Sequence, residues 1–241
     1  MKGGLRMTGG EGLASTSKIS QQVKRARQMD LHVHTTYSDG NSELRAVVDK
    51  AIALGIKDLG ITDHYGDLEW YSITSITQLD EYIAELTGLK QLYQPKINIW
   101  IGLEMSILNG LPFLQLNKLD YALFEDVEMG PRLSHLVSQV KPQLKIPVGI
   151  AHAQVIFLEK SADILEKEKI FIELNTHYPD RYRSNWARSI WHKLASRDIR
   201  LSVGSDAHDT KRIGDTGDAI RFMEENGLSQ KLWLPSKQQQ K

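Results

Sequence analysis

The sequence predicts one α/β domain whose parallel strands form a distorted seven-stranded (β/α)7 barrel of the TIM-like type. Two observations support this fold class. Short apolar runs alternate seven times with stretches of helical period, joined by short connections, which is typical of a parallel sheet covered by helices. The chain also has 241 residues, a length that a single barrel commonly fills. Seven repeats are one fewer than the usual eight, so we expect an irregular barrel.

The expected strands and helices follow one another from residue 29 onward. The strands are expected at residues 29–33, 58–61, 97–103, 121–124, 147–151, 170–174 and 199–203. The helices are expected at residues 44–54, 77–93, 131–140, 161–169, 185–196 and 213–226. The first helix illustrates the signals: Ser42 can cap it, apolar residues such as Leu44 and Val48 recur at helical spacing, and Gly55 ends it.

The composition is that of an ordinary globular protein, with 41% hydrophobic and 25% charged residues. Thirty basic and thirty acidic residues give a net charge of zero, so no global field draws the chain to nucleic acid or to a membrane. Cysteine is absent, which excludes disulfides, thiolate ligands and a cysteine nucleophile. Because this also fits a reducing compartment, we expect a cytoplasmic protein. No apolar run approaches the roughly 20 residues of a membrane helix.

The two ends differ in composition from the barrel. Residues 1–28 are rich in Gly, Ser and Lys/Arg and have no hydrophobic period, so we expect a flexible extension. An organellar transit peptide is the alternative, and an expression scar or misassigned start is a third reading because Met29 directly precedes the first strand. We expect the barrel to occupy residues 29–235 and residues 236–241 to form a solvated tail.

Histidine and carboxylate residues stand at or just past the ends of the expected strands. A parallel barrel gathers the carboxyl ends of its strands onto one rim, so these side chains should meet. Imidazole and carboxylate together suit divalent transition metals. The residues are His32, His34, Asp39, Asp63, His64, Glu104, His152, Asp206 and His208.

The spacing within this set supports one shared site. Residues two apart in a strand point the same way, which applies to His32 with His34 and to Asp206 with His208. Glu104 ends an apolar run, where a carboxylate is costly to bury unless a cation meets it. Taken singly, each residue also fits a polar surface position or a helix cap. Five strand ends that carry such residues together predict a metalloenzyme.

This set, in this order, resembles the polymerase and histidinol phosphatase (PHP) family of metal-dependent phosphoesterases. The resemblance runs from about residue 29 to residue 227 through the stretches DLHVHTTYSDG, GIKDLGITDHYG, IGLE, VGIAH, IELN and SVGSDAHDTKRIG. It implies a distorted seven-fold β/α barrel that binds two or three divalent ions, commonly zinc, manganese or iron, with magnesium as a further candidate. The ligand sets it implies are His32, His34, Glu104 and Asp206 for the first ion, Glu104 and His152 for the second, and His64 and His208 with Asp39 for the third.

The chain departs from the family pattern after the fourth strand. Family members usually carry a histidine there, in a stretch like DYVIGSVH, whereas this chain reads LDYALFEDVE. Glu125 or Asp126 could substitute, because carboxylates also bind zinc and manganese. Strand alternation favours Glu125, and the harder ligand would shift the second site towards manganese or magnesium. The alternative is a weak or empty second site.

The expected activity is hydrolysis of a small-molecule phosphomonoester, similar to that of a histidinol phosphatase. The ions would bind phosphate oxygens and activate water, with Glu104 shared between them and Asp206 or His208 as proton donor to the leaving group. His177, Arg181 and Arg183 follow the sixth strand, where an arginine could bind phosphate, although a solvated loop is the alternative.

Two other functions remain open. A metal-dependent amidohydrolase has a similar barrel, but it usually adds a bridging lysine where this chain has Glu104. A PHP module that binds metal without catalysis is the other, because a lost ligand can mark a lost activity. We expect no nucleic-acid partner, since the chain has no basic stripe, and no membrane partner. The substrate, the metals and the oligomeric state stay open.

Overall fold

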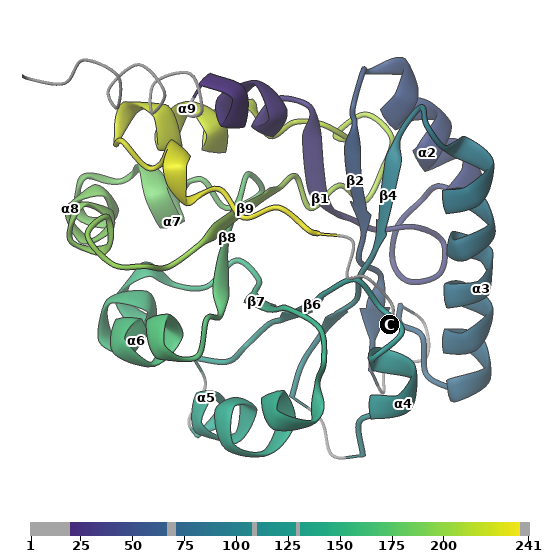
Figure 1. The fold of residues 1–241 in the computed structure, drawn as a ribbon, viewed down its shortest axis with the longest axis horizontal. Helices are drawn as coiled ribbons and strands as arrows, with labels where there is room; N and C mark the ends of the chain where they lie inside the picture. Colours follow the sequence, from purple (N-terminus) through teal and green to yellow (C-terminus); the bar gives the residue numbers. More distant parts are fainter. Residues whose placement is uncertain (1–19, 67–70, 108–109, 129–130, 237–241) are drawn as a thin grey trace, which may run out of the picture.

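The computed structural model describes residues 20–66, 71–107, 110–128 and 131–236. Its strands run side by side through the interior and its helices lie around the outside (Figure 1). One sheet pairs three strands, in the order β1 (Met29–Val33), β2 (Asp58–Ile61) and β4 (Asn98–Ile101). The other pairs six strands, in the order β3 (His64–Tyr65), β5 (Glu104–Met105), β6 (Ala122–Phe124), β7 (Val148–Ile150), β8 (Phe171–Asn175) and β9 (Leu201–Gly204). Every pairing between these strands is parallel, which confirms the α/β class.

The two sheets are continuous with each other along the chain. β3 follows β2, and β5 follows β4, after two residues in each case, and the Glu104 N–H donates to the Asp63 carbonyl (3.1 Å) across the gap. At the other edge, β1 meets the end of β9, where the His34 N–H donates to the Ala207 carbonyl (2.9 Å). The strands are nevertheless hydrogen-bonded as two separate sheets. A closed seven-stranded barrel is therefore not confirmed and stays a prediction.

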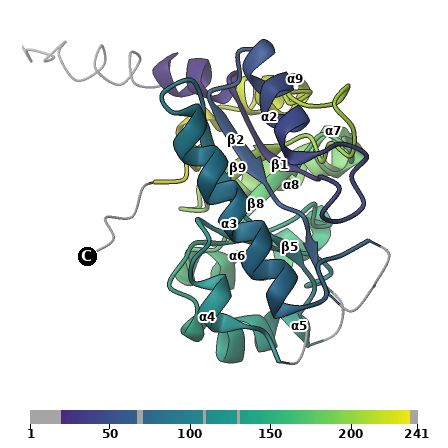
Figure 2. The same ribbon diagram turned by 90° about the vertical axis from the view of Figure 1, so that its right-hand side faces the viewer.

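The helices cover the outer faces of the strands, with α3 along one long side (Figures 1 and 2). They are α2 (Leu44–Ala53), α3 (Ile76–Tyr93), α4 (Phe113–Leu116), α5 (Arg132–His135), α6 (Val155–Lys167), α7 (Asp180–Arg183), α8 (Asn185–Leu194) and α9 (Gly217–Glu225). A π-helical turn (Leu136–Val140), two 3-10 turns (Lys141–Gln143 and Ser229–Lys231) and a helix at residues 20–26 are the other helical segments of the described residues.

Some helix boundaries differ from the expectation. The cap predicted at Ser42 is wrong: Glu43 takes the N-cap position of α2 and makes no side-chain cap hydrogen bond. Ser75 instead caps α3 through a capping box with Gln78, the arrangement that satisfies two orphan N–H groups at once. α6 begins at Val155, earlier than predicted, because Val155 and Leu158 extend its buried face.

Aromatic side chains fill the interior near the amino ends of the strands. Tyr121 precedes β6 and its hydroxyl donates to the Leu31 carbonyl (2.7 Å), while Phe171 at the start of β8 stacks on Trp233 with ring centroids 3.9 Å apart. A side chain at Gly60 of β2 would overlap the Tyr121 hydroxyl, so this strand position requires glycine. The histidines of the strand ends lie instead at the opposite, carboxyl end of the strands.

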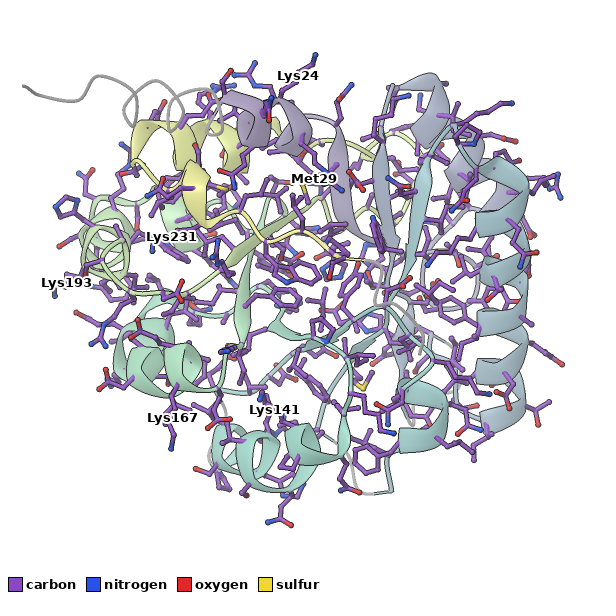
Figure 3. All side chains as sticks on the ribbon, viewed as in Figure 1. Lys24, Met29, Lys141, Lys167, Lys193 and Lys231 are labelled. Atoms are coloured by element: carbon purple, nitrogen blue, oxygen red, sulfur yellow. The ribbon has the colours of Figure 1, made fainter. Side chains whose placement is uncertain are left out.

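The N-terminal segment differs in part from the predicted extension. Residues 1–19 and 237–241 lie outside the described residues, but residues 20–26 form a helix. Its Arg25 pairs with buried Asp58 in bidentate fashion, Nε to Oδ2 at 2.9 Å and Nη2 to Oδ1 at 3.0 Å. Composition alone predicts that these basic residues are solvated. It does not reveal their carboxylate partners, because those lie far along the chain. In Figure 3, Lys24 of this helix points outward, and Met29, which follows the helix, is fully buried. Among the described residues, none of the helices combines the length and apolar composition that crossing a membrane requires.

Candidate metal centre

The strand-end histidines and carboxylates converge into three adjoining groups. In each group the donor atoms all lie within 4.8 Å of one another. The first group is His32, His34, Glu104 and Asp206; the second is Glu104, Glu125 and His152; the third is His34, Asp39, His64 and His208.

The first group is buried. His32 lies on β1, His34 follows it, Glu104 begins β5, and Asp206 follows β9. His32 Nε2 lies 3.0 Å from His34 Nε2 and 2.9 Å from Glu104 Oε2, and His34 Nε2 lies 3.2 Å from Asp206 Oδ1. The two imidazoles therefore point to one place, as their two-residue spacing predicted.

The second group shares Glu104 with the first. Glu104 Oε1 lies 2.8 Å from His152 Nε2, whereas Oε2 faces the first group, so one carboxylate reaches both. Glu125 joins this group and Asp126 does not. The Asp126 side chain is 51% exposed and its carboxylate faces Arg132 at 3.6 Å. The structure therefore places Glu125, the carboxylate that strand alternation favoured, beside Glu104 and His152.

The third group depends on a loop that folds back over the strand ends. Asp39 Oδ2 lies 3.0 Å from His208 Nε2 and 3.8 Å from His64 Nε2. A Cβ at Gly40 would lie 2.6 Å from backbone atoms of residues 34 and 35, so only glycine permits this close return. Buried Asp63 belongs to no group. It accepts hydrogen bonds from the Thr35 N–H (2.7 Å) and the Ser38 hydroxyl (2.6 Å), and so it holds the loop in place.

Two of the grouped residues have unusual backbone conformations. His152 and Asp206 have φ values of 31° and 55°, in the left-handed region that non-glycine residues seldom adopt. Each directly follows a strand region and turns its side chain towards the other donors. Strain of this kind persists where the surroundings hold it, and it clusters at functional sites.

The charges of the groups depend on one another. Burial acts to raise the pKa of Glu104, but the neighbouring His32, His152 and His34 together outweigh it and hold the pKa well below its usual range. Burial and the nearby Glu104 raise the pKa of Glu125 to about 7. Burial lowers the pKa of His64 to about 4, despite the opposing field of Glu104. Each group thus changes its protonation with its neighbours, which is typical of functional sites.

The donor set fits divalent ions. In these groups, carboxylate oxygens and ring nitrogens lie about 3 Å apart. Ligand atoms arranged around an ion with bonds of about 2 Å have this spacing. Buried Glu104 Oε1 makes no hydrogen bond of good geometry within the described part of the chain, although His152 Nε2 is close. A cation among these atoms would satisfy them together. Nitrogen with oxygen donors suits zinc, iron and manganese.

Sequence reasoning missed Glu173 as a part of this region. Its carboxylate is buried on β8 and lies 2.7 Å from Nδ1 of His32. A signal was present, because Glu173 and Asn175 share the two-residue spacing that singled out His32 and His34, within a short apolar strand.

The expected phosphate-binding residues divide into one that lies at the groups and two that do not. Arg181 Nη1 lies 3.2 Å from His152 Nδ1, and the guanidinium carbon lies 4.1 Å from the centre of the Tyr178 ring. Arg183 is instead held by Asp218 of α9, Nε to Oδ2 at 2.5 Å, which disfavours the phosphate binding expected at Arg183. His177 is exposed and belongs to none of the three groups; its Nδ1 faces Arg212 at 3.2 Å.

The fold and the groups together define a class: a parallel α/β protein with a histidine and carboxylate metal centre at the carboxyl ends of its strands. Comparison with known proteins makes this more specific. Residues 30–142 match the family model of the PHP domain. This match confirms that the chain resembles the PHP domain family, as the motifs predicted.

The known proteins similar to this chain are distant in sequence. It is 22% identical over 204 residues to the DNA polymerase/3'-5' exonuclease PolX of Bacillus subtilis (strain 168), covering 77% of this chain and 35% of that protein. The chain thus spans about a third of the length of that curated relative.

Solved structures resemble the chain over most of its length. A histidinol phosphate phosphatase from Lactococcus lactis, complexed with zinc, L-histidinol and phosphate, has a TM-score of 0.63 at 17% identity and covers 83% of this chain and 94% of its own. Metal-dependent tyrosine phosphatases from Bacillus subtilis and Streptococcus pneumoniae are represented by a structure with a TM-score of 0.53 at 16% identity, covering 82% of this chain and 86% of its own. At these identities the likeness establishes the shared fold.

Proposed function

We propose that the protein is a metal-dependent phosphoesterase that hydrolyses a small-molecule phosphate monoester. The observation that carries this proposal is the position of Glu104, whose two oxygens face two adjoining groups of donors. Two ions that share a ligand form the arrangement that clamps a phosphate during in-line displacement. The match of residues 30–142 to the PHP domain model supports the same reaction class.

We take the three groups as the ligand sets. The first ion would be held by His32, His34, Glu104 and Asp206, the second by Glu104, Glu125 and His152, and a third by Asp39, His64 and His208, with His34 beside it. Ions at these positions supply charge neutralisation for the phosphate and activation of a water molecule. The remaining steps belong to the protein side chains.

Two residues are placed to act on the substrate directly. Arg181 lies over the Tyr178 ring and next to His152, and from there its guanidinium would bind non-bridging oxygens of the phosphate. Burial tends to raise the pKa of Asp206, but the neighbouring His32 and His34 together lower it overall, which makes Asp206 a poor proton donor. The hydrogen bond with Asp39 raises the pKa of His208, so we assign protonation of the leaving oxygen to His208.

The substrate proposal is narrower than the fold alone supports. The Lactococcus structure contains L-histidinol and phosphate, and the proteins of the second comparison are tyrosine phosphatases. We therefore place histidinol phosphate first among candidate substrates and a phosphotyrosine compound second. A polynucleotide is the contrasting substrate, since the relative in Bacillus subtilis is a DNA polymerase and exonuclease.

The test is turnover by the purified full chain after chelation and after reconstitution. We expect the chelated protein to be inactive on p-nitrophenyl phosphate and on histidinol phosphate, and manganese or zinc to restore activity. The variant Glu104→Gln should stay inactive, whereas Asp126→Asn, altered one residue beyond Glu125, should keep wild-type activity. Full activity without metal would refute the proposal. Hydrolysis of amides or lactones alone would favour an amidohydrolase, and ion binding without turnover of any ester would favour a non-catalytic module.

A further inference from the structure

One buried carboxylate contacts residues of two metal groups and belongs to neither. The Glu173 side chain, on β8, is only 1% exposed. Its Oε1 lies 2.7 Å from His32 Nδ1, and its Oε2 accepts hydrogen bonds from the His152 backbone N–H (3.1 Å) and from the Asn175 amide (3.1 Å). Glu173 thus joins a ligand of the first ion to a ligand of the second.

The contact with His32 determines which ring nitrogen carries the proton. A carboxylate oxygen accepts hydrogen bonds, so the proton of the neutral imidazole lies on Nδ1. The lone pair is then on Nε2, which faces Glu104 Oε2 at 2.9 Å in the first group. Only this tautomer presents Nε2 to an ion. A carboxylate behind a ligating histidine also fixes the ring orientation and makes the ligand more basic.

The contact with His152 holds a strained part of the backbone. His152 has a φ of 31°, and its N–H is the group that Glu173 Oε2 accepts. Without this acceptor, the buried N–H would lose its partner and the residue could relax to an ordinary conformation. The ring would then move away from Glu104 Oε1, which now lies 2.8 Å from His152 Nε2.

The neighbouring strand leaves room for this arrangement. A Cβ at Gly204, on β9, would overlap both Glu173 Oε1 and the Cβ of His32. Asn175 extends the contacts further, because its amide also reaches Asp206 Oδ2 at 3.3 Å. One buried network therefore touches His32, His152 and Asp206.

We propose that Glu173 is a positioning residue that fixes the tautomer of His32 for the first ion and the backbone of His152 for the second, so that both ions depend on it. This inference rests on the metal centre proposed above. Its consequence is specific to Glu173→Gln, since an amide has one oxygen for two sets of donors. If the amide NH2 of this variant faces His32, it donates to Nδ1 and forces the imidazole proton onto Nε2. If the NH2 instead faces the His152 N–H and the Asn175 amide, donor groups face each other and these hydrogen bonds are lost.

The experiment uses zinc as the probe and compares Glu173→Gln with Asp58→Asn. Asp58 is a matched control, because it is also a buried strand carboxylate with three donor residues, Arg25, Asn98 and Trp100. Asp58 stands at the amino end of β2, whereas the three donor groups lie at the carboxyl ends of the strands. We expect Glu173→Gln to weaken zinc binding roughly 10- to 100-fold, the usual cost of losing a partner behind a metal ligand.

Zinc affinity is measured by competition with a chromophoric chelator, and stoichiometry by elemental analysis. Asp58→Asn should lower the melting temperature and keep wild-type zinc affinity and stoichiometry. The cobalt-loaded Glu173→Gln protein should also show an altered visible spectrum, which a loss of stability alone does not produce. Wild-type zinc affinity in Glu173→Gln, or an equal loss in Asp58→Asn, would overturn the inference.

A second measurement needs no variant at Glu173. In the zinc-loaded wild-type protein with 15N-labelled histidine, NMR should show His32 protonated at Nδ1, assigned by comparison with His32→Gln. A proton on Nε2 would overturn the inference even if Glu173→Gln failed to fold. If the wild-type protein bound no divalent ion, the proposed metal centre itself would fail, a result distinct from a normal centre that is insensitive to Glu173.

Discussion

The guanidinium of Arg181 donates to Nδ1 of His152 across 3.2 Å, while the other ring nitrogen lies 2.8 Å from Glu104. Arginine is always a donor, so this contact requires a lone pair on Nδ1. An ion bound at Nε2 requires the proton on Nδ1 instead. The two contacts therefore exclude each other in a neutral imidazole, and ion binding should release Arg181 from His152.

A prediction for Arg181→Ala follows from this exclusion. Removal of the guanidinium should lower kcat/KM for a phosphate monoester about 10- to 100-fold, since a hydrogen bond to a charged group contributes about 1.5–3 kcal/mol. The affinity for the second ion should stay the same or increase, because a competitor for His152 is gone. Steady-state kinetics and manganese titration measure the two effects.

Arg183→Ala provides the control for Arg181→Ala. Its guanidinium is committed to Asp218, so this variant should lose stability and keep its kcat/KM. If Arg183→Ala lost as much kcat/KM as Arg181→Ala, the distinction between the two arginines would be wrong.

The metal preference of the second group should depend on Glu125. With Glu104, Glu125 and His152, this group offers two carboxylates and one imidazole, a harder donor set than one with two imidazoles. Glu125→His should shift the second ion from manganese towards zinc, by roughly tenfold in relative affinity. Competition between the two metals, followed by manganese EPR, measures the shift.

The neighbouring residue offers a matched control for this substitution. Asp126 is half-exposed and lies outside all three groups, so Asp126→His should leave the preference unchanged. An identical shift in both variants would contradict the assignment of Glu125 to the second ion.

The sequence predicted the donor groups better than it predicted their surroundings. His32, His34 and Asp206 could be found because strand period and residue type are local properties, and the carboxyl ends of parallel strands must meet. Arg183 could not be separated from Arg181 by any local property, since its partner Asp218 belongs to a later helix. Such a role depends on a partner far along the chain, which local sequence does not identify.

The same limit applies to the N-terminal segment and to the sheet. Residues 20–26 looked solvated because their composition is polar and basic, but Arg25 pairs with Asp58, 33 positions away. Strand breaks after residues 61 and 101 arise where the chain bends from one sheet into the other, and apolar periodicity does not reveal such bends.

The stability of the ion-free protein should depend on pH through Glu125. Its pKa of about 7 lies above the value of about 4.3 expected in the unfolded chain. The folded state therefore binds more protons between these values, and its stability falls as the pH rises through them. Glu125→Gln removes this loss. At pH 8 it should be more stable than the wild-type protein by up to about 4 kcal/mol, at 1.36 kcal/mol per pKa unit.

Urea unfolding in the presence of a chelator checks this prediction at two pH values. The advantage of Glu125→Gln should be present at pH 8 and should nearly vanish by about pH 3.5, below the unfolded pKa, where both states are largely protonated. A constant difference across this range would mean that Glu125 does not titrate as its surroundings imply.

Ion binding should stabilise the fold, and Asp206→Asn should reduce that effect. An ion present at 100 times its Kd adds about 2.7 kcal/mol to the free energy of unfolding, provided the unfolded chain does not bind it. The wild-type protein should therefore melt at a higher temperature in manganese or zinc than in chelator. In Asp206→Asn an oxygen that faces His34 at 3.2 Å is lost or neutralised, so the metal-induced rise should shrink. Lys193→Gln, on the exposed face of α8, is the control and should show the full wild-type rise. An undiminished rise in Asp206→Asn would show that the ion binds elsewhere.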